Sequence, residues 1–378
     1  MNFGLSDQQK GLQSAARQFA EESIKPVASK YDDAQEFPWE VVHKAYAAGL
    51  MNLRIPKEYG GRGLDNVSSC LVMEELAAGC AGISNAIGVN NLATLPILIA
   101  GTREQKERFF APLCSGLYLA AFGLTEAQAG SDVAAMKTVA RREGDEYRLN
   151  GAKWFISNGG VANLYTVFAS VDPEKKSKGI TAFVVPRDTP GLTIGKRADK
   201  MGIRASDVSE VLLENVCVPV ANRLGEEGDG FKIAMKTLDA SRPEVAAEAV
   251  GIARAALEAA IAYSKERQTF EQPISNNQAI RMLLADMATD VDTARLLVHR
   301  AAWFLDQGLS PTLEGAMAKC RAADVAVKVA TEAVQIFGGY GYLKDYPVEK
   351  LMRDAKIYQI FEGTNQINRL VIAREILR

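Results

Sequence analysis

The sequence contains very little histidine and no regularly spaced cysteine, and these shortages exclude several kinds of active site. Only two histidines occur among 378 residues, His43 and His299, and they lie in unrelated stretches. The five cysteines are scattered without a CxxC pair, and their odd number is not typical of a disulfide framework. We therefore expect no metal site and no histidine-dependent catalytic triad, and a reducing compartment is favoured.

The chain also lacks an excess of charge of either sign. It has 44 Lys and Arg against 46 Asp and Glu, so its formal net charge is −2. A nucleic-acid-binding surface needs a basic patch, and a polybasic membrane anchor needs a run of Lys or Arg. The composition provides neither, so we predict no nucleic-acid partner.

No long apolar run or targeting segment is apparent. The most apolar stretch, residues 88–100, is interrupted by Asn90, Asn91 and Pro96, and we interpret it as too short and too polar to span a bilayer. The residues from Met1 to Leu5 have neither the basic nor the apolar region of a signal peptide. We expect a soluble, cytoplasmic protein of bacterial type without membrane insertion.

The composition that is present, 48% hydrophobic and 24% charged, is that of a globular protein, and its character changes twice along the chain. Residues 1–117 show helical spacing of apolar residues, with Ser6 and Thr102 at helix-capping positions. Residues 118–222 contain short runs of Val, Ile and Phe between turn signals, which is typical of strands. Residues 223–378 return to long helical segments. We predict a mainly α protein with an N-terminal helical domain, a small central β domain of barrel or sandwich type, and a C-terminal four-helix bundle.

The first segment with chemical potential is Ala-Phe-Gly-Leu-Thr-Glu-Ala-Gln-Ala-Gly-Ser-Asp at 121–132, which follows a predicted strand. Its small and hydroxyl residues would let a ligand approach backbone amides, which can hydrogen-bond a phosphate or the edge of a flavin. On its own, the segment is better explained as an ordinary strand-exit loop. Neither a Walker loop nor a GxGxxG fingerprint occurs in the chain, so nicotinamide binding on a Rossmann fold has little support.

Two further segments change this interpretation: Trp-Phe-Ile-Ser-Asn-Gly-Gly at 154–160, and Tyr-Gln-Ile-Phe-Glu-Gly-Thr-Asn-Gln-Ile-Asn-Arg at 358–369. In the second, Glu362 lies among apolar and aromatic neighbours just before a Gly-Thr turn into a helix. Burial there would raise the pKa of this carboxyl group and make it usable as a base. The alternative is an acid at a helix N-terminus that is favoured by the helix dipole.

Together, these three segments resemble the acyl-CoA dehydrogenase family of flavoproteins, and so does Pro-Val-Glu-Lys-Leu-Met-Arg-Asp-Ala-Lys at 347–356. The likeness covers essentially the whole chain and runs closest to the medium-chain and short/branched-chain enzymes. It implies an FAD-dependent oxidoreductase of fatty acid metabolism, in β-oxidation, acting on a CH–CH group. Such an enzyme oxidises an acyl-CoA thioester to the trans-2-enoyl-CoA and passes the electrons to electron transfer flavoprotein.

The resemblance also implies the catalytic and substrate-binding residues. Glu362 matches the base that removes the α-proton, while the flavin N5 of FAD accepts the β-hydride. The thioester carbonyl is polarised in the family by the backbone amide of the base residue and a ribityl hydroxyl. Some branches place the base at the position of Ser241, which cannot serve here. Substrate contacts are implied for Ser131, Asp239, Arg242, Phe361 and Gly363.

The FAD-binding residues implied by the resemblance form three groups. The flavin ring is expected near Phe122, Leu124, Thr125, Gly130 and Ser131, with Phe155, Ile156 and Ser157 on its other side. A neighbouring subunit is expected to extend Arg267, Thr269 and Phe270 toward the FAD pyrophosphate, where an Arg fork is well suited. The rest of the cradle is Gln278, Gln335, Ile336, Phe337, Gly338, Gly339, Thr364 and Gln366. A shared site implies a homo-oligomer, and we expect a homotetramer built as a dimer of dimers.

Departures from the family pattern bear on these expectations. Thr125-Glu126-Ala127-Gln128 stands where Thr-Glu-Pro-Gly is frequent, and Phe155 and Ser157 replace the usual Trp and Thr of the flavin segment. The aromatic face and the hydroxyl group are retained, so FAD binding is still expected. Phe270-Glu271 replaces the common Phe-Gly and places a carboxylate near the expected inter-subunit contact.

Two alternatives share the same fold. An acyl-CoA oxidase-like enzyme would give its electrons to oxygen, but such oxidases commonly have an added C-terminal region. A non-catalytic, DNA-associated flavoprotein would need a basic surface, which a net charge of −2 does not favour. The resemblance places the floor of the acyl pocket at residues 82–95 and at the neighbours of Glu362. The bulk of these residues does not choose between straight, branched and cyclic acyl groups, and we expect short-chain, medium-chain or cyclic ones.

Overall fold

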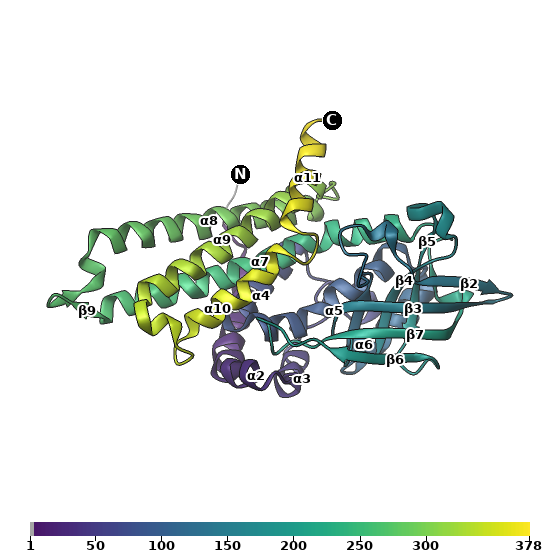
Figure 1. Ribbon diagram of the computed structural model, residues 1–378, viewed down its shortest axis with the longest axis horizontal. Helices are drawn as coiled ribbons and strands as arrows, with labels where there is room; N and C mark the ends of the chain where they lie inside the picture. The colour runs from purple at the N-terminus through teal and green to yellow at the C-terminus, as the bar shows by residue number, and fades with distance from the viewer. Residues whose placement is uncertain (1–3) are drawn as a thin grey trace.

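The computed structural model describes residues 4–378, and it shows an elongated molecule with a helical bundle at one end and a β-sheet at the other (Figure 1). Met1, Asn2 and Phe3, which contributed to the expectation of no targeting segment, lie outside the described residues.

The N-terminal region is helical, as predicted. Its helices are α1 (Asp7–Phe19), α2 (Ala28–Ala34), α3 (Trp39–Ala47), α4 (Asn66–Gly79), α5 (Ala81–Ala100) and α6 (Arg103–Ser115). The side chains of Ser6 and Thr102 each accept a hydrogen bond from the backbone N–H three residues ahead. In return, the side chains of Gln9 and Gln105 accept hydrogen bonds from the backbone N–H groups of Ser6 and Thr102. These two capping boxes satisfy N–H groups that have no partner within the helix, which is why α1 and α6 begin where the sequence predicted.

Helix α5 is longer and more continuous than the sequence suggested. Asn90, Asn91 and Pro96 all lie within the helix, which begins at Ala81. The interpretation of residues 88–100 as too short and too polar to span a bilayer was therefore wrong for the helix as a whole. The two asparagines do not interrupt the helix because their side chains bind backbone groups: Asn90 Oδ1 accepts from Ala120 N at 2.8 Å, and Asn91 Oδ1 accepts from Leu53 N at 3.1 Å. Among the described residues, α5 is the one helix long and apolar enough to cross a membrane, but 67% of its most apolar window is buried inside the protein.

The central region forms one eight-stranded sheet. Its strands are β1 (Ala120–Gly123), β2 (Val139–Glu143), β3 (Glu146–Ser157), β4 (Leu164–Ser170), β5 (Ile180–Pro186), β6 (Leu192–Arg197), β7 (Val208–Pro219) and β8 (Arg223–Leu224). The order is β6-β7-β3-β2-β4-β5-β8, and β1 pairs in parallel with β4. The predicted hairpin is present, with Gly144 in the left-handed conformation (φ 63°) between β2 and β3. Strands β4 and β5 are buried almost throughout, which explains their continuous runs of Val, Ile and Phe.

The C-terminal region is again helical. It contains α7 (Gly230–Glu266), α8 (Gln278–Asp306), α9 (Thr312–Phe337), α10 (Pro347–Ala355) and α11 (Asn365–Ile376), with a small hairpin of β9 (Gln268–Thr269) and β10 (Gln272–Pro273) after α7. Helices α7 to α10 pack together, and α11 extends away from them toward the C-terminus (Figure 1). The helix–sheet–helix plan is therefore confirmed.

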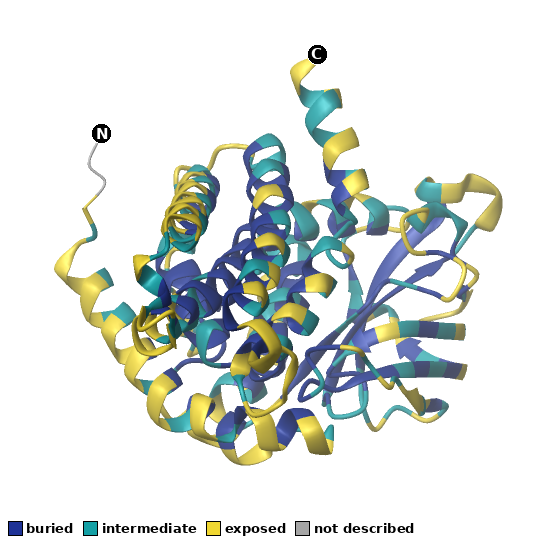
Figure 2. Ribbon diagram, turned by 60° about the vertical axis from the view of Figure 1, so that its left-hand side comes forward, coloured by how far each residue is buried: buried dark blue, intermediate teal, exposed yellow. Residues whose placement is uncertain are grey.

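The two helical regions share one hydrophobic core rather than packing as separate bodies. Buried alanines of α7 and α9 lie in the same cluster as side chains of α1, α4 and α5. Figure 2 shows this continuous buried interior beneath an exposed outer layer. Small side chains let the helices approach closely, so α4 and α5 lie directly against the bundle.

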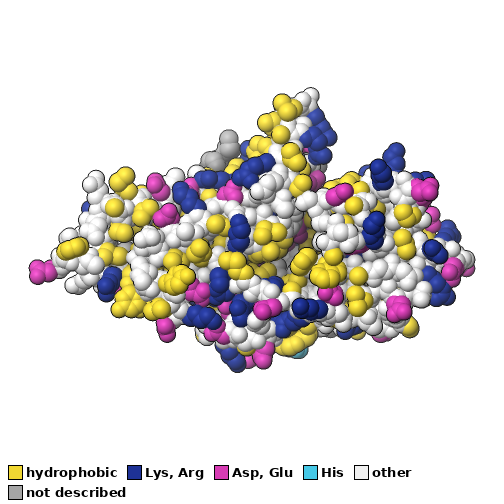
Figure 3. All heavy atoms as spheres, viewed as in Figure 1, with side chains coloured by type: hydrophobic (Ala, Val, Ile, Leu, Met, Phe, Trp, Pro, Cys, Tyr) yellow, Lys and Arg dark blue, Asp and Glu magenta, His cyan; other side chains and the backbone are white. Residues whose placement is uncertain are grey.

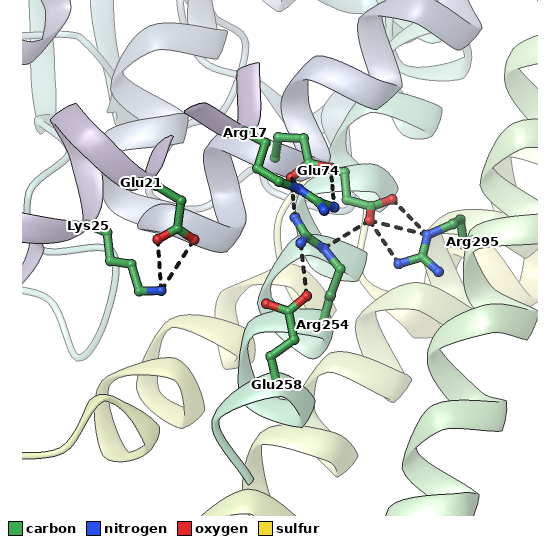
Figure 4. Close-up of polar contacts among 8 residues, drawn as sticks. Arg17, Glu21, Lys25, Glu74, Arg254, Glu258 and Arg295 are labelled. Atoms are coloured by element: carbon green, nitrogen blue, oxygen red, sulfur yellow. Dashed lines mark hydrogen bonds and ion pairs between the residues drawn. The ribbon is translucent and has the colours of Figure 1, made fainter. Parts of the chain in front are cut away.

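Buried charges also join the N-terminal helices to the bundle (Figure 4). Glu74 and Glu75 of α4 are only 3% and 1% exposed. Glu75 accepts hydrogen bonds from Arg17 of α1 at 3.0 Å and from Arg254 of α7 at 2.5 Å. Arg295 of α8 lies 2.9 Å from Glu74. Buried carboxylates are tolerated only when they are paired and hydrogen-bonded in this way, so the network holds four helices in register.

We predict that Glu75→Ala lowers the free energy of unfolding by about 3–5 kcal/mol, because it leaves the Arg254 guanidinium buried without one of its carboxylates. The control is Glu258→Ala, which removes another carboxylate partner of Arg254 that is largely exposed. It should cost no more than about 1 kcal/mol. Urea unfolding of the three proteins measures both effects, and equal losses in the two variants would contradict the role assigned to the buried pair.

Candidate active site

A cavity of about 380 Å³ lies where the N-terminal helices, the sheet and the bundle meet. Helices α4 and α5, the loop after β1, the end of β3, helix α7 and the turn before α11 all contribute to its lining. It brings together the three segments singled out from the sequence. The predicted residues that line it are Phe122, Leu124, Thr125, Gly130, Ser131, Phe155, Ile156, Ser157, Arg242, Phe361, Glu362 and Gly363.

Glu362 lies in a tight turn of unusual backbone geometry. Its φ is 56° and that of Gly363 is 83°, so two successive residues adopt the left-handed conformation, which a residue with a side chain rarely does. Strain of this kind persists where the surroundings hold the chain firmly, and it is concentrated at functional sites. The turn places the Glu362 carboxyl in the cavity, where Oε2 accepts a hydrogen bond from Ser241 Oγ at 2.8 Å.

Burial raises the pKa of the Glu362 carboxyl above its usual range, while the Ser241 hydroxyl and the charges of Arg242 and Lys319 act against that rise. A carboxylate that is partly desolvated and has an elevated pKa is a better proton acceptor than one in water. The arrangement therefore suits a general base whose ionised form is stabilised by the Ser241 hydroxyl and the nearby positive charges.

Lys319 of α9, which was not predicted from the sequence, anchors this turn by hydrogen bonds. Its Nζ donates to Gly363 O at 2.8 Å and to Asn365 Oδ1 at 3.2 Å. Asn368 Nδ2 also donates to Gly363 O, at 2.8 Å, and Thr364 caps α11 by accepting from Ile367 N. Burial lowers the pKa of Lys319 to about 8. The available signal was a single lysine within the apolar run Ala-Met-Ala-Lys-Cys of a long helix.

An exposed aromatic ring faces the cavity from the end of β3. Phe155 is 64% exposed although it lies within a sheet, and its φ of 57° is left-handed. The pairing of β3 with β7 shifts register between Lys153 and Ile156, and such a β-bulge redirects the side chains that follow it. The bulge thus turns an aromatic face toward the cavity instead of into the core.

A buried ion pair fixes the loop after β1 to strand β3. Lys153 is fully buried, and its Nζ donates to Glu126 Oε1 at 2.8 Å and to Leu124 O at 3.2 Å. Glu126 also accepts from the backbone N–H groups of Lys137 and Thr138. Every oxygen of the carboxylate is therefore used to close the loop, so the turn remains anchored although Ala127 and Gln128 depart from the frequent family sequence.

A second cavity, of about 390 Å³, lies beside the β9–β10 hairpin. The predicted residues that line it are Arg267, Thr269, Ile336, Phe337, Gly338 and Gly339. A side chain at Gly338 or Gly339 would meet no atom within 4 Å, so the glycines leave open space for a ligand. Phe270, at the tip of the hairpin, is 93% exposed. Gln278 and Gln335, also predicted to contact FAD, are exposed at the start of α8 and near the end of α9.

The predicted FAD-binding residues therefore fall into two sets that one chain does not bring together. The hairpin lies at the end of the bundle farthest from the sheet, whereas the first cavity lies against the sheet (Figure 1). An exposed aromatic face beside a loop of backbone amides suits a flat flavin ring, and an arginine beside open glycines suits a pyrophosphate. Both sets have the chemistry that FAD requires.

The predicted residues that line neither cavity are Asp239, Phe270, Gln278, Gln335, Thr364 and Gln366. Asp239 instead orients Arg242: its Oδ1 accepts from Arg242 Nη1 at 2.6 Å, and its Oδ2 accepts from Thr312 Oγ1 at 2.7 Å. Arg242 Nε is buried without a hydrogen-bond partner, which leaves a donor free beside the cavity. Gln366 is exposed on the first turn of α11.

Two further carboxyl groups that the sequence analysis missed line the first cavity. Glu244 accepts from Ser69 Oγ at 2.6 Å and lies 3.7 Å from Arg54. Glu248 is 4% exposed, and its two oxygens accept from Ser84 Oγ and Tyr358 Oη, each at 3.0 Å. Their signal in the sequence was a pair of acids four residues apart that interrupts the apolar stripe of α7.

Charged side chains of both signs are interspersed on the face of the molecule seen in Figure 3. Within residues 4–378, no three His, Cys, Asp or Glu side chains are grouped as they would be to hold a metal ion.

Comparison with known proteins identifies the family. Residues 6–117, 121–216 and 228–377 match the N-terminal, middle and C-terminal domains of acyl-CoA dehydrogenases, respectively. The chain is 45% identical over 379 residues to the short-chain-specific acyl-CoA dehydrogenase of Clostridium acetobutylicum, with 100% of both chains covered. It is also similar to the structure of butyryl-CoA dehydrogenase from Megasphaera elsdenii, with a TM-score of 0.98, 45% identity and 100% of both chains covered. A chain in a structure described as the electron transferring flavoprotein of Acidaminococcus fermentans, concerned with flavin-based electron bifurcation, gives a TM-score of 0.98 at 46% identity, again with complete coverage of both.

We predict that Glu248 makes the stability of the protein depend on pH in a defined direction. Burial raises the pKa of Glu248 to about 8, compared with about 4.5 when the group is unburied. The folded protein therefore holds this proton more tightly than the unfolded chain does. The stabilisation is complete below about pH 4.5 and is lost as the pH rises toward 8.

Between these limits, the free energy of unfolding should fall more steeply with pH in the parent protein than in Glu248→Gln, which has no titratable group at this position. Urea unfolding at several pH values measures the difference. Glu258→Gln, on the exposed side of the same helix, should follow the parent curve. Parallel curves for the parent and Glu248→Gln would show that the carboxyl is not held in its neutral form.

Proposed function

Because the chain belongs to the acyl-CoA dehydrogenase family of FAD-dependent oxidoreductases, we propose that it oxidises a short- or medium-chain acyl-CoA thioester to the trans-2-enoyl-CoA. The observation that carries this proposal is the carboxyl group of Glu362, held in a strained turn inside the cavity that Phe122 and Phe155 also line. The removal of a weakly acidic proton beside a flavin requires a desolvated base. It also requires a surface of aromatic rings and backbone amides against which the flavin can lie.

In this proposal, Glu362 is the catalytic base. Its carboxylate accepts the α-proton of the thioester, and its backbone N–H donates to the thioester oxygen and stabilises the developing negative charge. Ser241 orients the carboxylate through the 2.8 Å hydrogen bond. Lys319 is a positioning residue, because it touches the turn through Gly363 O and not the reacting atoms.

FAD, when bound, supplies the acceptor that takes the β-hydrogen as a hydride. The residues proposed to hold its flavin end are Phe122, Leu124, Thr125, Gly130, Ser131, Phe155, Ile156 and Ser157. Those proposed for the remaining part are Arg267, Thr269, Phe270, Gln278, Gln335, Ile336, Phe337, Gly338, Gly339, Thr364 and Gln366. Ser131, Arg242, Phe361 and Gly363 are proposed to contact the acyl-CoA, with Asp239 acting through Arg242.

The proposed electron acceptor is electron transfer flavoprotein. This is supported by the 46% identical chain found in a structure described as an electron transferring flavoprotein. A short acyl group is supported by the names of the Clostridium and Megasphaera relatives, which are short-chain-specific and butyryl-CoA dehydrogenases. We further propose a role in the β-oxidation of fatty acids in a bacterial cytoplasm.

We also propose that the protein works as a homo-oligomer, a tetramer built as a dimer of dimers. The support comes from the two separated sets of FAD-binding residues, since one FAD could contact both only if a second copy supplied the Arg267 set. Large apolar side chains remain exposed on α8 and α11, among them Met282, Leu296, Trp303, Leu370 and Ile376. The proposed domains are residues 1–117, 118–222 and 223–378, and the ranges matched by the family domains support this division.

Replacing the base tests the reaction directly. We expect Glu362→Gln to lower turnover by at least about 10³-fold, because the amide keeps the shape and the hydrogen bond of the carboxyl but cannot accept the proton. FAD content and acyl-CoA affinity should remain close to those of the parent. The measurements are anaerobic bleaching of the visible flavin band by acyl-CoA, and binding by calorimetry.

Asp132→Asn is the matched control, because Asp132 is an exposed carboxylate at the same cavity and should not affect the rate appreciably. If Glu362→Gln retained turnover, Glu362 would not be the base.

Replacing Arg267 tests the FAD contact proposed at the second cavity. Arg267→Ala should reduce both the flavin content and the stability of the oligomer, because the variant removes a cationic fork from the open space beside Gly338 and Gly339. Flavin absorbance per chain and sedimentation analysis provide the two readouts. Lys265→Ala removes an exposed cation two residues earlier and should leave both unchanged. A fully flavinated Arg267→Ala protein of unchanged oligomeric stability would rule out this contact.

A further inference from the structure

The first cavity has an exposed end and a buried end, and the buried end is polar. Ser131 and Asp132, which line it on one side, are exposed at the surface of the protein. Met73 and Glu248, which line it on the other, are 2% and 4% exposed and lie within the core between α4, α5 and α7. An acyl chain that reaches past the base into the protein therefore ends near a carboxyl group.

The spacing along α7 separates this carboxyl from the catalytic end. Ser241, which hydrogen-bonds the base, and Glu248 are seven residues apart, so they lie on the same face of the helix about 10 Å apart along its axis. Because both residues line the cavity, different residues of the same helix can contact the thioester end and the far end of one acyl group.

Glu248 differs from the two other buried acids of the cavity, Glu244 and Glu362, because no positive charge acts on it. Its two oxygens accept only from the hydroxyl groups of Ser84 and Tyr358. By contrast, Glu244 lies 3.7 Å from Arg54, and the charges of Arg242 and Lys319 act on Glu362.

Among the cavity-lining residues that the structure describes, no Lys or Arg forms an ion pair with Glu248. The one Lys or Arg among them is Arg242, whose guanidinium is already paired with Asp239 at 2.6 Å. A terminal carboxylate on the acyl group would therefore be buried without an opposite charge, which is unfavourable.

Burial favours the neutral carboxyl form of Glu248, which has one O–H donor and keeps accepting positions beyond the two that Ser84 and Tyr358 use. A plain hydrocarbon chain placed against Glu248 would leave the remaining hydrogen-bonding positions of its carboxyl group without water and without a partner. This is unfavourable for a buried polar group. A donor on the far end of the acyl group would satisfy the accepting positions. Sites built around such a hydrogen bond discriminate strongly against analogues that lack it.

We infer that Glu248 is a specificity-determining residue that selects acyl groups with a hydrogen-bond donor, a hydroxyl or an ammonium, on the distal carbon. Such groups bind in preference to plain alkyl chains of the same length, and acyl groups with a terminal carboxylate are rejected. The inference rests on the proposed function, because it takes the substrate to be an acyl-CoA.

The test compares unsubstituted, ω-hydroxy, ω-amino and ω-carboxy acyl-CoAs of equal length, from four to eight carbons. Affinity is measured by calorimetry on the FAD-loaded Glu362→Gln protein, in which turnover is prevented, and kcat/KM is measured on the active enzyme. The ω-hydroxy or the ω-amino compound should be favoured at least about tenfold over the unsubstituted one, and the ω-carboxy compound should bind most weakly.

Two substitutions then locate the preference. Glu248→Leu, which offers only hydrocarbon, should abolish or reverse it. Glu248→Gln should keep a preference for a hydroxyl and lose a preference for an ammonium, so this variant identifies the donor that the parent recognises. Glu258→Leu, on the exposed side of the same helix, should leave every ratio unchanged.

Equal or tighter binding of the unsubstituted acyl-CoAs by the protein with Glu248 intact would overturn the inference without the need for any variant at that position. An unchanged ratio in Glu248→Leu would do the same, since Glu248 would then be only a structural partner of Ser84 and Tyr358. If unsubstituted acyl-CoAs bind and bleach the flavin without discrimination, the inference fails while the proposed function stands. If no acyl-CoA binds or bleaches the flavin, the proposed function itself fails.

Discussion

The length and rigidity of α7 constrain the rest of the structure. Its 37 residues form a helix about 55 Å long, and it contributes to almost every feature described above. Between its start and its middle, Ser241, Arg242 and Glu248 line the first cavity, and in its second half Arg254 pairs with the acids of α4. The hairpin with Arg267 follows its last turn. Because a helix cannot fold back on itself, the cavity at one end and the hairpin at the other are kept far apart within a single chain.

The core around α7 combines small apolar side chains with buried charge. Alanines allow close helix packing, and the acids that enter this core are almost all compensated, as Glu74 and Glu75 are by three arginines. Burying a charge is costly, so buried carboxyl groups that have no direct ion pair are informative. Glu362 and Glu248 both lie at the cavity, and burial raises the pKa of each. The strained residues Phe155 and Glu362 line the same cavity. The features that cost stability, strained backbone and unpaired buried carboxyl groups, are therefore concentrated at the cavity, where a ligand would contact them.

Much of the fold could be predicted from local signals. The capping boxes at Ser6 and Thr102 and the turn at Gly144 depend on neighbours within three residues, so they are readable from sequence. Helix α5 was misjudged because the groups that satisfy Asn90 and Asn91, the backbones of Ala120 and Leu53, are distant in sequence. Glu362 was found because its neighbours form a motif. Lys319 and Glu248 were missed because each is a charged residue with small apolar neighbours in a long helix that also carries exposed charges, so nothing local distinguishes it from a surface residue.

By itself, the sequence determined the helix–sheet–helix plan and the family, since both depend on the order and spacing of residues along the chain. It also indicated Glu362 as the base, because a carboxylate among aromatic residues before a Gly-Thr turn is a local pattern. Only the tertiary structure decided which groups surround that base, because Ser241 and Lys319 reach it from α7 and α9. It also decided that the buried end of the cavity is acidic and that Arg267 lies far from Phe122. These properties depend on packing between segments that are distant along the chain, such as Lys319 and Gly363, 44 residues apart, and Ser241 and Glu362, 121 residues apart. The desolvation of a carboxyl group likewise depends on everything around it.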